Sequence, residues 1–165
     1  MRPQQKQTLA GRAHISDFIL HEIGFWHEPQ SGRLPADPTR LVRPDWAGPL
    51  RPRLIEYLRF GHKLIGYLGS SFCRFQCGAP RARLGLWDLT DGVWIWPEGL
   101  AHYLEVHGLA LPDAFLAHAS QNDFAFSARV LARIPDLAYV QTHRSAALWE
   151  QWVRDNDGVL SQGAG

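Results

Sequence analysis

Two cysteines and two histidines stand at spacings that suit a metal ion. Three residues separate Cys73 from Cys77, and four residues separate His102 from His107. Structural zinc sites pair cysteines separated by two to four residues with histidines separated by three to five. Thiolate and imidazole are also donors that suit zinc. The sequence therefore predicts a structural zinc site with Cys73, Cys77, His102 and His107 as its ligands.

One short helix must present both histidines, and we expect it at residues 98–107. On a straight helix, side chains five positions apart point about 140° away from each other. Both imidazoles reach one ion only if the last turn tightens or unwinds, and Gly108 directly after the helix allows such an ending. If the helix stays regular, His107 faces the core, and the fourth ligand is water or an acid such as Asp88 or Asp91.

A β-hairpin fills the interval between the cysteines and the histidines. Strand-forming residues at 84–90 and 93–96 flank the pair Asp91-Gly92. Asp-Gly between such segments is a strong signal for a type I′ turn, because both turn positions need a positive φ. We therefore expect a cysteine turn, a hairpin and a histidine-bearing helix in that order.

The other elements surround this central unit. Six prolines between residues 28 and 53 disfavour regular structure, and Trp46 favours an arm packed on the surface over a free linker. The spacing of apolar residues predicts helices at 14–27, 53–60, 113–118, 124–134 and 145–155, and a strand at 63–69.

These elements predict an α+β fold, with a small antiparallel sheet, flanking helices and a zinc-finger-like Cys2His2 element in the middle. We divide the chain into an N-terminal helix and proline-rich arm at 1–53, a zinc-binding core at 54–118, and C-terminal helices packed on the core at 119–165.

Length and composition exclude several classes of protein. The chain has 165 residues, a net charge of +1 and 45% hydrophobic residues, which suits one globular domain and not a disordered chain or a polybasic membrane binder. No apolar run approaches the roughly 20 residues of a transmembrane helix. The polar start of the chain has no signal-peptide core, so we expect a cytoplasmic protein without a membrane partner.

A longer motif surrounds the four candidate ligands. It consists of Cys73-Arg74, Cys77-Gly78, Thr90-Asp91-Gly92, the run Trp-Pro-Glu-Gly-Leu-Ala-His-Tyr from Trp96 to Tyr103, His107, and Leu111-Pro112. This segment resembles a family of uncharacterised bacterial proteins, in which two residues separate the cysteines where this chain has three. The resemblance implies a metal site at these cysteines and histidines, and it implies no reaction.

We favour a zinc-stabilised bacterial binding protein whose partner is another protein, for example in a regulatory or toxin-neutralising role. Four protein ligands close a zinc site, so that no catalytic residue is assigned. The first alternative is a zinc-dependent hydrolase or deaminase-like enzyme. It needs an open coordination position and an acid or base nearby, for which Glu98, Glu105 and Asp91 are the candidates.

The second alternative is a nucleic-acid-binding zinc module. Arg74, Arg81 and Arg83 cluster around the cysteines and could contact phosphates. The near-neutral charge of the whole chain makes this interpretation the weaker one.

Overall fold

The computed structural model describes residues 19–27, 29–33 and 37–157. Within these residues the sheet has five strands in the order β2-β3-β4-β1-β5. The strands are β1 (Leu20–Glu22), β2 (His62–Gly66), β3 (Trp87–Thr90), β4 (Trp94–Pro97) and β5 (Arg144–Ser145). The predicted α+β class is confirmed.

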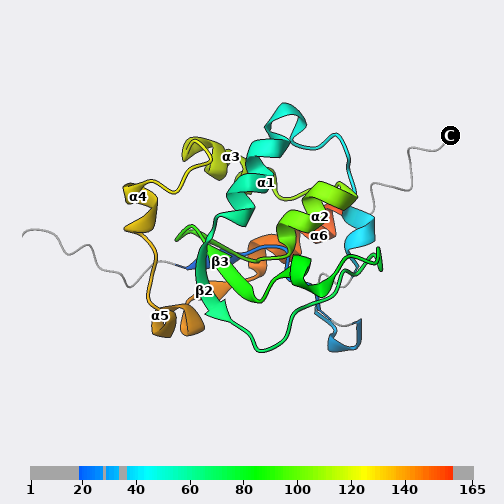
Figure 1. The fold of residues 1–165 in the computed structure, drawn as a ribbon, viewed down its shortest axis with the longest axis horizontal. Coiled ribbons are helices and arrows are strands. Elements are labelled where there is room, and N and C mark those ends of the chain that lie inside the picture. Colours follow the sequence, from blue (N-terminus) through cyan, green and yellow to red (C-terminus); the bar gives the residue numbers. More distant parts are fainter. Residues whose placement is uncertain (1–18, 28, 34–36, 158–165) are drawn as a thin grey trace, which may run out of the picture.

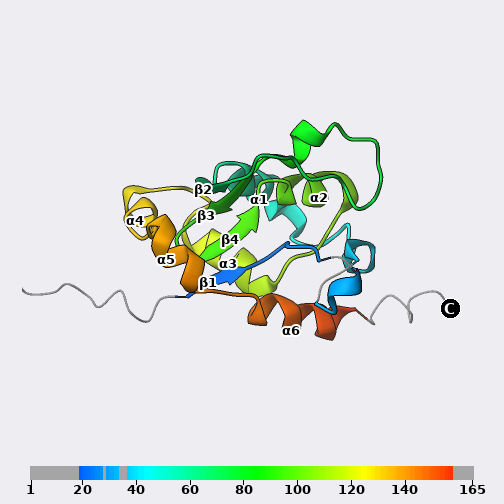
Figure 2. The ribbon, with the colours of Figure 1, turned by 90° about the horizontal axis from the view of Figure 1, so that it is seen from below.

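The sheet is mixed. Strands β2, β3 and β4 pair antiparallel, as expected for the predicted hairpin and its neighbour. Strand β1 pairs parallel with β4 on one side and with β5 on the other. Figure 2 shows β1 and β4 side by side and running in the same direction. The antiparallel sheet expected from the sequence is thus extended by two parallel pairings.

The helix predicted at residues 14–27 is wrong where the structure describes the chain. Residues 14–18 lie outside the described residues, and Leu20–Glu22 form the strand β1. Leu20 and Ile23 are both fully buried, and Glu22 is nearly so. A strand enclosed between two parallel neighbours does not alternate between apolar and polar residues, so its short apolar pattern resembles that of a helix.

The described residues form six α-helices, which pack around the sheet. They are α1 (Arg51–Arg59), α2 (Leu100–His107), α3 (Asp113–Gln121), α4 (Ala128–Leu131), α5 (Leu137–Thr142) and α6 (Ala147–Asn156). Helices α1, α2, α3 and α6 confirm four predicted helices, while the helix expected at 124–134 is reduced to the single turn of α4. Helix α5 was not predicted. No helix of the described residues is both long and apolar enough to cross a membrane.

Helices lie on both sides of the sheet. Figure 1 shows α1 beside α2, and Figure 2 shows α6 beneath β1, on the side opposite to that pair. The core between these layers contains large aromatic side chains, of which Trp96, Trp149 and Phe115 are almost fully buried. Buried aromatic rings contribute large apolar areas to such a core. Packing in this core therefore fixes the positions of α2 and β4.

The proline-rich stretch is a packed arm, as predicted. Its described part contains the short 3-10 helices η2 (Pro29–Ser31), η3 (Pro38–Leu41) and η4 (Gly48–Leu50). The N–H of Arg43 donates to the carbonyl of Gly108, and the N–H of Ala110 donates to the carbonyl of Leu41. The arm therefore fixes the chain directly after α2. A fourth 3-10 helix, η5 (Arg81–Leu84), precedes β3.

The Asp91-Gly92 turn joins β3 to β4 as predicted, but it is not of type I′. Gly92 has φ 85°, whereas Asp91 is not among the described residues with positive φ. The Asp91 side chain explains the difference, because its Oδ1 accepts the N–H groups of Val93 and Trp94 at 2.8 and 2.7 Å. A side chain that bonds to the backbone two and three residues ahead provides its own turn geometry.

We expect Gly92→Val to destabilise the protein by about 2 kcal/mol or more, because a β-branched residue resists positive φ and lacks space here. A Cβ at this position would lie 2.9 Å from the backbone carbon of Arg133. Gly69→Val is the matched control, since nothing lies within 4 Å of a Cβ there. Thermal unfolding measures both variants, and equal melting temperatures for the two would contradict the close approach.

Candidate metal centre

The cysteines lie in the long loop between β2 and β3, which passes the C-terminal end of α2 (Figure 1). A turn begins at Cys73, whose carbonyl accepts the N–H of Gln76 at 3.0 Å. Gln76 and Gly78 on either side of Cys77 have φ 51° and 75°. Two residues with positive φ reverse the chain sharply, so that Cys77 turns back toward Cys73.

Both histidines lie on α2, which stays α-helical up to His107, so the expected tightening or unwinding of its last turn does not occur. His107 is the last residue of α2, and Gly108 follows it with φ 65° as a left-handed cap. The helix therefore ends at His107, and no further helical turn follows that could block its side chain. The two imidazole rings lie 5.1 Å apart between centroids, so the five-residue spacing does not prevent them from meeting.

The four predicted ligands meet at one point. Their donor atoms all lie within 4.8 Å of one another. The distance from Cys73 Sγ to His107 Nε2 is 3.3 Å, and that from Cys77 Sγ to His102 Nε2 is 3.5 Å. In a tetrahedral zinc site with ordinary Zn–S and Zn–N bond lengths, sulfur and nitrogen lie about 3.5 Å apart. The cluster could hold a metal ion with little rearrangement.

The protonation of the ligands suits metal binding. Burial lowers the pKa of His102, and the neighbouring charges of His107 and Arg83 lower it further. Burial also lowers the pKa of His107. Both imidazoles are therefore neutral near pH 7 and keep a lone pair for a metal.

The Cys73 thiol is buried, and the Cys77 side chain is exposed. Burial raises the pKa of Cys73, while hydrogen bonds from the backbone N–H groups of Phe75 and Cys77 act in the opposite direction. Amide groups aimed at sulfur favour the thiolate. The N–H groups of the turn therefore offset part of the cost of burying a Cys73 thiolate, and a bound cation would offset the rest.

Two aromatic residues support the cluster, and neither was predicted to have a role in the metal site. Phe75, between the two cysteines, stacks on the His107 ring with centroids 4.0 Å apart and planes 3° apart. The Tyr103 hydroxyl accepts the N–H of Arg74 at 2.9 Å and thereby ties the cysteine turn to α2. An aromatic residue within a short Cys–Cys interval is the signal that could have pointed to Phe75.

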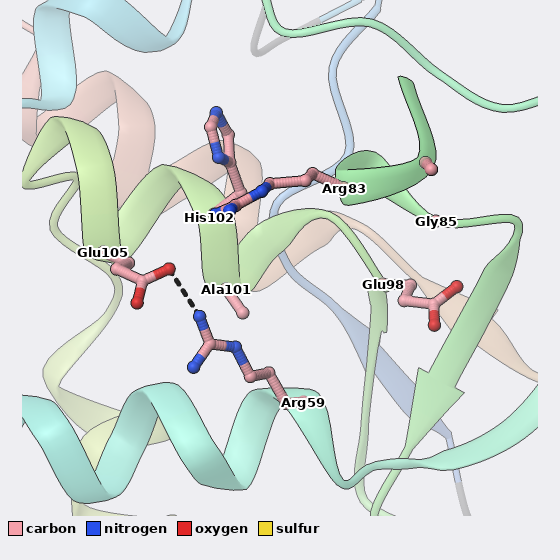
Figure 3. A pocket seen from close by; sticks show the side chains of 8 residues that line it. Arg59, Arg83, Gly85, Glu98, Ala101, His102 and Glu105 are labelled. Carbon is pink, nitrogen blue, oxygen red and sulfur yellow. Dashed lines mark hydrogen bonds and ion pairs between the residues drawn. The ribbon is translucent and has the colours of Figure 1, made fainter. Parts of the chain in front are cut away.

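A cavity of about 320 Å³ lies beside His102, between α1, α2 and η5. Figure 3 shows Arg83 extending from η5 toward His102, and Arg59 paired with Glu105 across the cavity. The Nδ1 atom of His102 is buried and has no hydrogen-bond partner among the described residues. Its Nε2 faces Cys77, so Nε2 is the nitrogen available to a metal.

The acids named as alternatives have other partners. Oε2 of Glu98 accepts the N–H of Leu86 at 2.8 Å, and Glu105 pairs with Arg59. Asp91 is fully buried and holds the hairpin turn. Neither Asp91 nor Asp88 belongs to the four-ligand group.

The arginines Arg81 and Arg83 are exposed on η5, and the guanidinium of Arg74 lies 4.9 Å over the Phe72 ring.

The chain matches no protein-family model, no curated protein and no solved structure. The resemblance to the bacterial family stays a prediction. The geometry of the four side chains therefore carries the functional argument.

Proposed function

We propose that Cys73, Cys77, His102 and His107 bind one zinc ion, and that the protein is a zinc-stabilised binding protein. One observation carries this proposal: two thiol and two imidazole donors from distant segments lie within 4.8 Å of one another. Two sulfur and two nitrogen ligands in tetrahedral range favour zinc over harder cations such as magnesium or calcium.

The proposed role of the ion is structural. Four protein ligands fill a tetrahedral shell and leave no position for water or substrate. The loop with the cysteines has little regular structure between β2 and η5, and the ion would fasten it to the end of α2. Glu98 and Glu105 line the cavity beside His102, and they are already bonded to Leu86 and Arg59. These bonds argue against an acid or base poised for catalysis.

A protein partner is the proposed target of this loop. Leu68 and Phe72, which precede the first cysteine, expose large apolar side chains, with Leu68 fully exposed and Phe72 about half exposed. Apolar residues gathered on one exposed segment are typical of interaction sites. The zinc ion would hold the end of this segment in a fixed position.

His102→Ala and His107→Ala test whether the site is closed. We expect each variant to bind zinc at least about ten-fold more weakly than the wild type, because each removes one metal bond. Competition with a chromophoric chelator measures the affinities. His118→Ala is the matched control: His118 lies on α3, faces Asp91 at 3.1 Å and is not part of the four-ligand group, so its variant should bind zinc as the wild type does.

Similar losses at both positions support the closed structural site. A loss at His102 alone would show that His107 is not a ligand. The coordination shell would then have an open position, and the zinc-dependent enzyme would become the better proposal.

A further inference from the structure

A cavity of about 400 Å³ opens onto both candidate thiol ligands. Its lining includes Cys73, Cys77 and Arg81, the first residue of η5. Neither histidine of the candidate metal centre lines it. A small molecule that enters this cavity therefore meets the two cysteines before it meets the histidines.

The two thiols differ in their access to solvent. Cys77 is exposed, whereas Cys73 is buried. Cysteines that respond to oxidants are accessible to solvent and often lie next to a second cysteine, which resolves the first oxidation product. The exposed Cys77 meets the first condition, and Cys73 is placed for the second role.

The turn that carries the cysteines keeps their sulfur atoms close together. These atoms lie within 4.8 Å of each other, and a disulfide bond holds two sulfur atoms about 2.05 Å apart. Gln76 and Gly78, with φ 51° and 75°, reverse the chain around Cys77, so rotation of two side chains within one short turn can close this gap. The chain has two cysteines in total, so a disulfide within one molecule can join only these two.

Arg81 adds a positive charge to the cavity. Its side chain is exposed, and among the described residues no acidic side chain lines this cavity. Reactive cysteines are typically found in exposed, electropositive surroundings. A guanidinium also stabilises negative charge that develops on an oxygen atom in a transition state, which favours a reaction in which hydroxide leaves.

We propose that Cys73 and Cys77 form an oxidative modification site, at which hydrogen peroxide converts the two thiolate ligands to a disulfide and zinc is released. This inference rests on the proposed zinc site. The Cys77 sulfur attacks one peroxide oxygen, the O–O bond breaks, and hydroxide leaves, which gives a sulfenic acid. The Cys73 sulfur then attacks the Cys77 sulfur, the S–O bond breaks, and a second hydroxide leaves. The two sulfur atoms together lose two electrons, and the two peroxide oxygens gain them.

The disulfide would remove both sulfur donors from the metal ion. A structural zinc site needs four protein ligands, so two imidazoles alone would not retain the ion. The loop between β2 and η5 would then lose its attachment through the metal to the end of α2. Oxidation would thereby release the segment with Leu68 and Phe72, which is the proposed contact with a protein partner.

Treatment of the zinc-loaded full-length protein with hydrogen peroxide tests this inference. A chromophoric chelator measures released zinc, and mass spectrometry without reductant detects the loss of two hydrogen atoms that accompanies disulfide formation. We expect zinc release at least about ten-fold faster than without peroxide, in step with the change in mass, and renewed zinc binding after reduction by a thiol. The inference is overturned if the protein keeps its zinc and both thiols, or if the cysteines gain oxygen atoms and form no disulfide.

The zinc content before peroxide is added distinguishes two kinds of failure. Protein that contains no zinc contradicts the proposed function, and this inference with it. Protein that holds zinc and resists peroxide contradicts this inference alone.

Cys73→Ser and Cys77→Ser identify the sulfur that attacks peroxide. Dimedone, which traps sulfenic acids, should label Cys77 in the first variant at least about ten-fold faster than Cys73 in the second, because only Cys77 is exposed. Equal labelling of the two folded variants would contradict the order of attack. If either variant fails to fold, zinc release and disulfide formation in the wild type still decide the proposal.

Discussion

Replacing Cys73 by serine is expected to weaken zinc binding on the order of 100-fold or more, because a thiolate ligand is lost from a closed shell. Zinc that binds only the native state also stabilises it, by about 2.7 kcal/mol when its concentration is 100 times the dissociation constant. Added zinc should therefore raise the melting temperature of the wild type and leave that of Cys73→Ser unchanged. Thermal unfolding with and without zinc measures the effect.

The controls separate loss of metal from loss of fold. Ser71→Ala, an exposed change two residues from Cys73, should keep the full response to zinc. Wild-type protein treated with a strong chelator should melt near the temperature of Cys73→Ser. A zinc-dependent rise in the Cys73→Ser variant as large as in the wild type would contradict the ligand assignment.

Asp91→Ala is expected to cost about 3–5 kcal/mol of unfolding free energy, the largest stability effect that we foresee for one side chain. Asp91 is fully buried. Its Oδ2 accepts the Tyr57 hydroxyl at 2.7 Å and lies 3.1 Å from His118 Nε2, while Oδ1 accepts two backbone N–H groups. Truncation leaves these buried donors without an acceptor. Denaturant unfolding gives the free energy.

The exposed Asp45 provides the comparison, since Asp45→Ala should change stability by no more than about 0.5 kcal/mol. Asp91→Asn should fall between the two, because its amide oxygen can still accept the backbone N–H groups of the turn. A loss below about 1 kcal/mol in Asp91→Ala would mean that the buried network contributes little to the fold.

The four candidate ligands could be predicted from the sequence because the patterns that indicate them are local. The two cysteines lie close together in the sequence, the two histidines do as well, and Gly108 directly follows His107. Local spacing predicts which side chains share a turn or a helix end. It could not predict that Phe75 stacks on His107, because that contact joins two segments 32 residues apart.

The parts of the fold that the sequence did not reveal depend on distant partners. Strand β1 pairs His21 with Trp94 and with Ser145. A three-residue strand has no periodicity of its own, and its parallel neighbours come from far along the chain. The same holds for Asp91. Its role in the turn is visible locally, whereas its bonds to Tyr57 and His118 appear only once α1 and α3 pack on the hairpin.

X-ray absorption spectroscopy of the protein purified without chelator tests the central claim most directly. The four-ligand site predicts one zinc ion per chain, with two sulfur atoms at about 2.3 Å and two nitrogen atoms at about 2.0–2.1 Å. Two results would contradict this claim. One is protein that contains no zinc although zinc was present during purification, and the other is a zinc ion surrounded by oxygen atoms without a sulfur shell.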